Sequence, residues 1–141
     1  MKNVLVTLVM MLGTISVGAQ AEPLAVIVSK DNPINELSVK DVKRIFLGKM
    51  KRFPSGGKIK MTDYKKGKSL RKTFYKKVTN KSVKDVDTYW YRLVFTGKGV
   101  PPKPFSDAED VIEYISEHPN AIGYIKLSEL KAGVKKVLLV R

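Results

Sequence analysis

Continuous apolar runs alternate along the chain with segments in which apolar residues recur every three or four positions. The runs predict buried strands, because they are short and rich in branched aliphatic residues: Leu24–Ser29, Ala121–Lys126 and residues 136–140, with a shorter candidate at residues 59–62. The periodic segments predict four helices, which begin at Ser38, Ser69, Ser82 and Ser106 and end near Gly48, Val78, Thr96 and Pro119. Because these elements interleave without a linker, we predict one α/β domain over residues 22–141.

The pentapeptide SVKDV occurs twice, starting at Ser38 and at Ser82. The residues that follow the two copies differ and no third copy exists, so the pattern does not indicate a repeat protein. Both copies instead predict helix N-termini, where the serine accepts a backbone N–H bond. Asp41 and Asp85, three positions later, would complete a capping box by reaching back to the N–H of the cap residue.

The first residues have the pattern of a secretory signal peptide. Lys2 precedes an uncharged apolar run, and Ala19-Gln20-Ala21 is an A-x-A cleavage site. The run is shorter than the roughly 20 apolar residues that a membrane-spanning helix needs. We therefore expect residues 1–21 to be removed and the mature chain to begin at Glu22, in the periplasm and without a membrane span.

Composition narrows the classes of function. The chain contains no cysteine, which excludes disulfides, thiolate metal sites and a cysteine nucleophile. Its formal net charge of +14 favours anionic partners such as phosphate groups, acidic lipids, anionic glycans or an acidic protein face. The lysines are spread along the chain, however, so a solvated basic surface without a specific partner is an equally good interpretation. No nucleic-acid-binding motif is present, and export argues against such a partner.

Signals for an enzyme are poor. His118, the only histidine, precedes a proline at a predicted helix end, which is a poor setting for a general base. The acids stand mostly at helix starts, where capping explains them, and no metal-ligand spacing is visible. Gly97-Lys98-Gly99 follows a helix rather than a strand, so it indicates a turn and not a nucleotide loop. Trp90 is predicted to be a core anchor. We expect no catalytic residues, no metal and no cofactor.

The best candidate for binding an anion is the predicted helix start within residues 65–71, KKGKSLR. A helix N-terminus offers free N–H groups and the positive end of the helix dipole, and here basic side chains surround it. An ordinary helix start among solvated lysines explains the same residues.

The order of these segments resembles the phosphate-type substrate-binding proteins of ABC importers, which have the periplasmic type II architecture. The segments that carry this resemblance are "NPINELSVKDVKRIFLGK", "FPSGG", "SLRKTFYKKV", "FTGKGVPP" and "PNAIGYIK". The resemblance covers residues 25–140 and is strongest to short members with a single lobe. It implies a single α/β lobe with a small mixed sheet flanked by about four helices.

The resemblance also locates a ligand site, but this sequence departs from the family's motif there. Phosphate binders of this family have an Arg-x-x-x-Ser-Gly-Thr stretch before a helical phenylalanine, here Phe74. Tyr64 stands at the arginine position, and the Ser-Gly-Thr positions are Lys68, Ser69 and Leu70. Only a serine remains, displaced by one place, so selective phosphate capture is not supported. The ligand residues implied are Tyr64, Lys68, Ser69 and Arg71.

Two classes of function follow. In the first, the protein is a monomeric periplasmic solute-binding module that holds a small phosphate-like anion weakly or assists transport or sensing. In the second, it is an interaction protein that docks its basic face on a membrane sensor, a transporter or an anionic envelope polymer.

Overall fold

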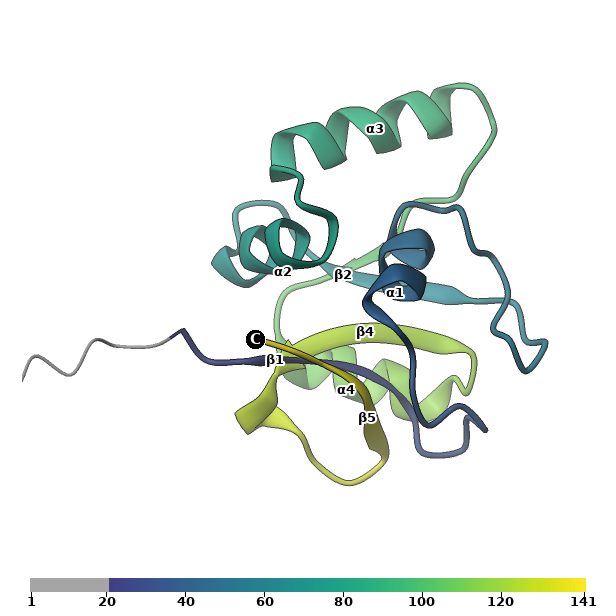
Figure 1. The fold of residues 1–141 in the computed structure, drawn as a ribbon, viewed down its shortest axis with the longest axis vertical. Helices are drawn as coiled ribbons and strands as arrows, with labels where there is room; N and C mark the ends of the chain where they lie inside the picture. Colours follow the sequence, from purple (N-terminus) through teal and green to yellow (C-terminus); the bar gives the residue numbers. More distant parts are fainter. Residues whose placement is uncertain (1–20) are drawn as a thin grey trace, which may run out of the picture.

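The computed structural model describes residues 21–141, which form a five-stranded mixed sheet with helices on both faces (Figure 1). The predicted signal peptide, apart from Ala21, lies outside these residues. The elements in chain order are β1 Leu24–Ser29, α1 Val39–Phe46, β2 Lys60–Tyr64, α2 Ser69–Thr79, α3 Val83–Phe95, β3 Lys103–Phe105, α4 Ala108–Glu117, β4 Ala121–Lys126, the 3-10 turn η1 Leu127–Glu129 and β5 Val134–Val140. The predicted α/β class with four helices is confirmed.

The strands lie in the order β3-β2-β4-β1-β5. β2 is parallel to β3 and β4, whereas β1 is antiparallel to β4 and β5. Among these five strands, β1 therefore runs in the direction opposite to the other four. β2, β3 and β4 end at the same edge of the sheet. In open α/β sheets, ligands bind beyond the carboxyl ends of such strands. Residues 65–68 lead from this edge into α2.

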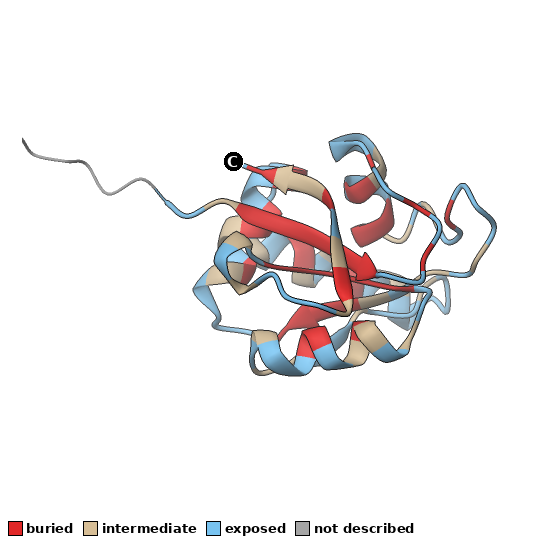
Figure 2. Cartoon of the chain, turned by 90° about the horizontal axis from the view of Figure 1, so that it is seen from below, coloured by how far each residue is buried: buried red, intermediate tan, exposed pale blue. Residues whose placement is uncertain are grey.

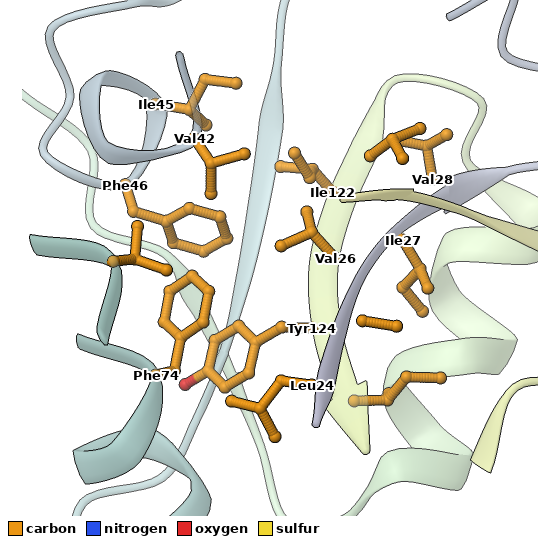
Figure 3. Packing of buried hydrophobic residues seen from close by; sticks show 14 of the residues in the cluster. Leu24, Val26, Ile27, Val28, Val42, Ile45, Phe46, Phe74, Ile122 and Tyr124 are labelled. Atoms are coloured by element: carbon orange, nitrogen blue, oxygen red, sulfur yellow. The ribbon is translucent and has the colours of Figure 1, made fainter. Parts of the chain in front are cut away.

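The side chains of β4 show how the two faces of the sheet are covered. Gly123 faces α4 so closely that an added Cβ would lie 2.8 Å from the Cδ1 of Ile115. The next residue, Tyr124, faces α1 and α2, where its ring stacks on Phe74 with centroids 3.7 Å apart and an edge-on contact to Phe46 (Figure 3). Beyond α2, α3 forms an outer layer that contacts α2 but stands away from the sheet (Figure 1).

Most predicted strands are confirmed, with small shifts. β1 is buried along its whole length, as its continuous apolar run predicts (Figure 2). The candidate strand at residues 59–62 is instead Lys60–Tyr64, which brings Asp63 and Tyr64 into the sheet. The last strand starts at Val134, two residues before the predicted start. The sequence did not predict β3, because it has three residues and one is Pro104, which only an edge position tolerates.

Both SVKDV serines cap helices as predicted. The hydroxyl oxygens of Ser38 and Ser82 each accept a bond from the backbone N–H three residues later, at 3.1 Å. Within residues 21–141, neither Asp41 nor Asp85 bonds back to its cap residue, so the second half of the capping box is not formed. The prediction for α4 was wrong by one residue, because Asp107, not Ser106, caps that helix.

Trp90 fixes α3 on the rest of the molecule. Its indole N–H donates to the carbonyl of Phe46, at the end of α1, at 3.2 Å, and only 6% of the residue is exposed. Gly48, which ends α1 with a φ of +69°, lies against the same ring. The prediction of Trp90 as a core anchor is confirmed, and the anchor holds one side of the candidate site.

Candidate functional site

A buried carboxylate lies at the end of β2. Asp63 is 5% exposed and accepts hydrogen bonds from four donors. Its Oδ1 accepts from the N–H of Tyr64 at 2.7 Å and from the hydroxyl of Tyr124. Its Oδ2 accepts from the hydroxyl of Tyr75 at 2.6 Å and from the Nε of Arg71 at 3.2 Å. A buried carboxylate is tolerated only when it is bonded and paired in this way.

Arg71 connects this carboxylate to α3. Its Nη2 lies 2.7 Å from the Oδ1 of Asp87, while its Nε pairs with Asp63. Burial by itself would lower the pKa of Arg71, but the charges of Asp63 and Asp87 outweigh it and raise that pKa above its ordinary value. The sequence analysis counted Arg71 among the basic side chains that surround the helix start. In the structure this residue is only 7% exposed, and its charge is compensated by the two aspartates.

The tyrosines around Asp63 are held in their neutral form. Burial raises the pKa of Tyr75 and of Tyr124 well above its ordinary value, and the adjacent negative charge of Asp63 raises it further. Burial also raises the pKa of Tyr64, whose hydroxyl has no hydrogen-bond partner in the described part of the chain. The network therefore consists of the carboxylates of Asp63 and Asp87, the guanidinium of Arg71 and the neutral hydroxyl donors of Tyr75 and Tyr124.

The start of α2 differs from the other helix starts. Its N-cap residue is Lys68, whose side chain makes no capping bond, and its first turn contains no acidic residue. Lys68 and Ser69 are exposed, as are Lys65 and Lys66 before them. α2 thus begins at an exposed residue without a side-chain cap and among cationic side chains, an arrangement that suits an anion.

A cavity of about 460 Å³ opens beside this helix start. Its lining combines the ionic groups Asp63, Lys65, Lys66, Arg71 and Asp87 with the apolar surfaces of Tyr64, Trp90, Tyr91, Val94, Pro101, Pro102 and Pro104. Lys66 bridges the two kinds of surface, because its Nζ donates to the Tyr91 hydroxyl at 2.7 Å and lies 3.8 Å from Asp87. The Tyr91 bond and the Asp87 charge raise the pKa of Lys66.

The structure brings together only part of the predicted site. Lys68 and Ser69 lie side by side at the exposed start of α2, whereas Arg71 and Tyr64 are buried below it and line the cavity. The sequence analysis did not single out Asp63, Asp87, Tyr75 or Tyr124. One signal was present: Arg71 and Tyr75 are four positions apart on one helix, flanking the apolar Phe74, and so share a face that needs an acidic partner.

Solved structures of phosphate-transport binding proteins share this fold. The chain matches an ABC-type phosphate transport receptor from Vibrio cholerae with a TM-score of 0.66 and 15% identity, over 82% of this chain and 45% of that chain. A protein described as a phosphate ABC transporter substrate-binding protein from Clostridium perfringens, with bound phosphate, gives 0.67 and 22%, over 82% and 44%. PstS from Borrelia burgdorferi gives 0.64 and 16%, over 82% and 46%.

These matches establish a resemblance in fold to part of a PstS-like periplasmic binding protein. The chain spans less than half the length of each of these proteins, in agreement with the single lobe that the sequence predicted. None of the protein-family models compared with the chain matches it, and no curated protein matches it either. No helix within residues 21–141 is both long and apolar enough to cross a membrane.

Proposed function

We propose that this protein is a solute-binding module of PstS-like fold, without enzymatic activity, that holds a small oxyanion such as phosphate at the start of α2. The uncapped start of α2 carries this proposal. Within residues 21–141, the other three α-helices each begin with a side chain that accepts one first-turn N–H and with an acidic residue that complements the helix dipole. α2 has neither, and Lys65, Lys66 and Lys68 precede it. The names of the structural neighbours, which are phosphate-transport proteins, support the same class of ligand.

Binding at this place should be weak. Lys68 and Ser69 are exposed, so a bound anion keeps part of its water shell and the lysine side chains lose rotamer freedom. Arg71 is committed to Asp63 and Asp87 and contributes by holding the helix start against the cavity rather than by direct contact. Tyr64 lines the cavity from the end of β2. We expect a dissociation constant for phosphate of about 1 mM, equivalent to about −4 kcal/mol.

Calorimetry in a phosphate-free buffer tests this site. Phosphate and sulfate are titrated into the mature protein and into two charge-reversed variants, Lys68→Glu and Lys131→Glu. Both residues are exposed and both changes alter the net charge equally, but Lys131 lies in the loop before β5. Lys68→Glu should weaken phosphate binding several-fold and Lys131→Glu hardly at all, because screening limits the reach of a surface charge to about 10 Å. Equal losses in the two variants, or a micromolar constant in the unchanged protein, would contradict the proposal.

The proposed location is the periplasm, after cleavage behind Ala21. The apolar run and the A-x-A sequence support it. The measurement is the intact mass of the protein recovered from the periplasmic fraction. A mass that starts at Glu22 is expected, and a mass that retains residues 1–21 would contradict the proposal.

A further inference from the structure

Within residues 21–141, four of the six exposed large apolar residues lie on α3 or on the loop that follows it. Phe95 is 93% exposed, Val100 80%, Tyr91 65% and Val94 47%. Tyr91, Val94 and Phe95 are spaced by three and four positions, so they form one stripe on the side of the helix that the core does not cover. An exposed apolar patch of this kind commonly marks an interaction site.

This stripe continues into the cavity beside α2. Tyr91 and Val94 belong to both, and Pro101, Pro102 and Pro104 supply a further apolar wall of the same cavity. The wall is preorganised, because proline fixes φ. Trp90, which also lines the cavity, is held in place by the bond from its indole N–H to the carbonyl of Phe46. A hollow with rigid apolar walls takes up an inserted side chain at little entropic cost.

Positive charge surrounds this apolar surface. Lys65 and Lys66 line the cavity, Arg92 lies next to Tyr91 on α3, and Lys98 lies between Phe95 and Val100; all four residues are exposed. Inside the cavity, Arg71 pairs with Asp63 and Asp87, and Lys66 lies 3.8 Å from Asp87, so the charges of these four groups balance. The excess positive charge comes from Lys65, Arg92 and Lys98. An occupant with negative charges around an apolar side chain is therefore complementary to the surface.

We propose that the stripe Tyr91/Val94/Phe95 and the adjoining cavity, here called the α3 surface, form a docking site for an acidic segment of a protein partner, which inserts an apolar side chain between α3 and the proline wall. The observations favour this occupant over two others. A bilayer surface is flat and cannot fill a hollow, and a second copy of this chain brings the same net charge of +14. The proposal goes beyond anion binding at α2 and does not depend on it.

Fluorescence anisotropy with synthetic peptides tests the α3 surface. The probe is a labelled peptide of Asp and Glu residues around a central Phe-Leu pair. Control peptides replace that pair by Ser-Ser, or the acids by Lys. The matched protein variants are Val94→Ser and Val39→Ser, since these valines are 47% and 48% exposed but Val39 lies at the start of α1.

The proposal predicts that the acidic Phe-Leu peptide binds, that both control peptides bind about tenfold more weakly or not at all, and that added salt weakens the complex. Val94→Ser should reduce the affinity about tenfold, while Val39→Ser leaves it unchanged. Equal binding of the Phe-Leu and Ser-Ser peptides would overturn the proposal, and so would equal affinities of the two valine variants. Both variants should keep the unfolding midpoint of the unchanged protein, which excludes a general loss of structure.

Further measurements separate the other occupants. Sedimentation of the protein with phosphatidylglycerol vesicles tests a membrane, and analytical ultracentrifugation of the protein alone tests a second copy. Vesicle binding or self-association that Val94→Ser abolishes, without peptide binding, would overturn the proposal in favour of that occupant. The anion site is tested separately with Phe95→Ser, because Phe95 belongs to the α3 surface but does not line the cavity. This change should weaken peptide binding and leave phosphate binding unchanged, whereas Lys68→Glu should affect phosphate more than the peptide. Failure of one proposal is thereby distinguished from failure of the other.

Discussion

The guanidinium of Arg71 on α2 lies 2.7 Å from the carboxylate of Asp87 on α3 and, through its Nε, 3.2 Å from that of Asp63 on β2. One cation thus joins a strand and two helices at the base of the cavity. It is buried and doubly paired, so its first role is structural, and the proposed anion binding rests on the exposed residues around Lys68.

Loss of the Arg71 charge should destabilise the protein strongly. Arg71→Met keeps most of the side-chain volume but leaves the buried Asp63 without its cation, which should lower the free energy of unfolding by about 3 kcal/mol. Asp87→Asn affects a carboxylate that is 23% exposed and should cost about 1 kcal/mol or less. Urea denaturation measures both. Equal and small losses would show that the ion pair does not hold the three elements together.

The two serine caps should contribute separately. Ser38→Ala and Ser82→Ala each remove a 3.1 Å capping bond and should lower the free energy of unfolding by about 0.5–2 kcal/mol. The effects should add in the double variant, because the caps lie on different helices and share no partner. Ser69→Ala is the control, since that serine forms no cap bond at the start of α2. A cost for Ser69→Ala as large as for the other two would contradict the assignment of the caps.

Alanine substitutions at two glycines distinguish the cost of backbone strain from the cost of a steric clash. Gly48 and Gly97 follow the ends of α1 and α3 with nearly the same φ, +69° and +68°. A Cβ at Gly48 would lie 2.9 Å from the Trp90 ring, whereas a Cβ at Gly97 would meet nothing within 4 Å. Gly97→Ala should therefore cost about 1 kcal/mol from the left-handed conformation alone. Gly48→Ala should cost about 1–3 kcal/mol more, because the Trp90 anchor must shift. Similar denaturation midpoints for both variants would rule out this role of Trp90.

Stability should fall at alkaline pH. The pKa values of Tyr64, Tyr75 and Tyr124 are raised in the folded protein, so above a pH of about 10 the unfolded chain loses protons that the folded protein keeps. The stabilising contribution is complete below that pH and decreases above it, by about 1.4 kcal/mol per pH unit for each tyrosine. Urea midpoints from about pH 8 to about pH 11 measure this decline. Tyr64→Phe should make it shallower without a cost near pH 8, because the Tyr64 hydroxyl has no partner within residues 21–141. A constant midpoint would contradict the tyrosine assignments.

The sequence predicted most of the secondary structure because local signals determine it. The apolar run of β1, the serines before α1 and α3 and the glycine after α1 each act within a few residues. The buried polar network could not be predicted in the same way. Asp63 and Tyr124 are 61 positions apart, and only the pairing of β2 beside β4 brings them together.

For the same reason, only the locally determined part of the candidate site could be predicted from the sequence. The cationic helix start at Lys68 is a local pattern and was predicted, whereas the burial of Arg71 depends on acids supplied by β2 and α3. The cavity is lined by Pro101 and Pro102 together with Val94, and this arrangement follows from the path of the loop after α3 and not from any periodicity.

The central claim is that an oxyanion binds at the start of α2, and backbone NMR tests it most directly. Phosphate is titrated to about 20 mM into the ¹⁵N-labelled mature protein, well above the expected dissociation constant. The account predicts that the amide signals of Ser69, Leu70 and Arg71 shift together along one saturable curve with its midpoint at about 1 mM, while those at the capped start of α1 stay in place. Shifts spread evenly over the exposed lysines, or no saturable shift in the first turn of α2, would contradict it.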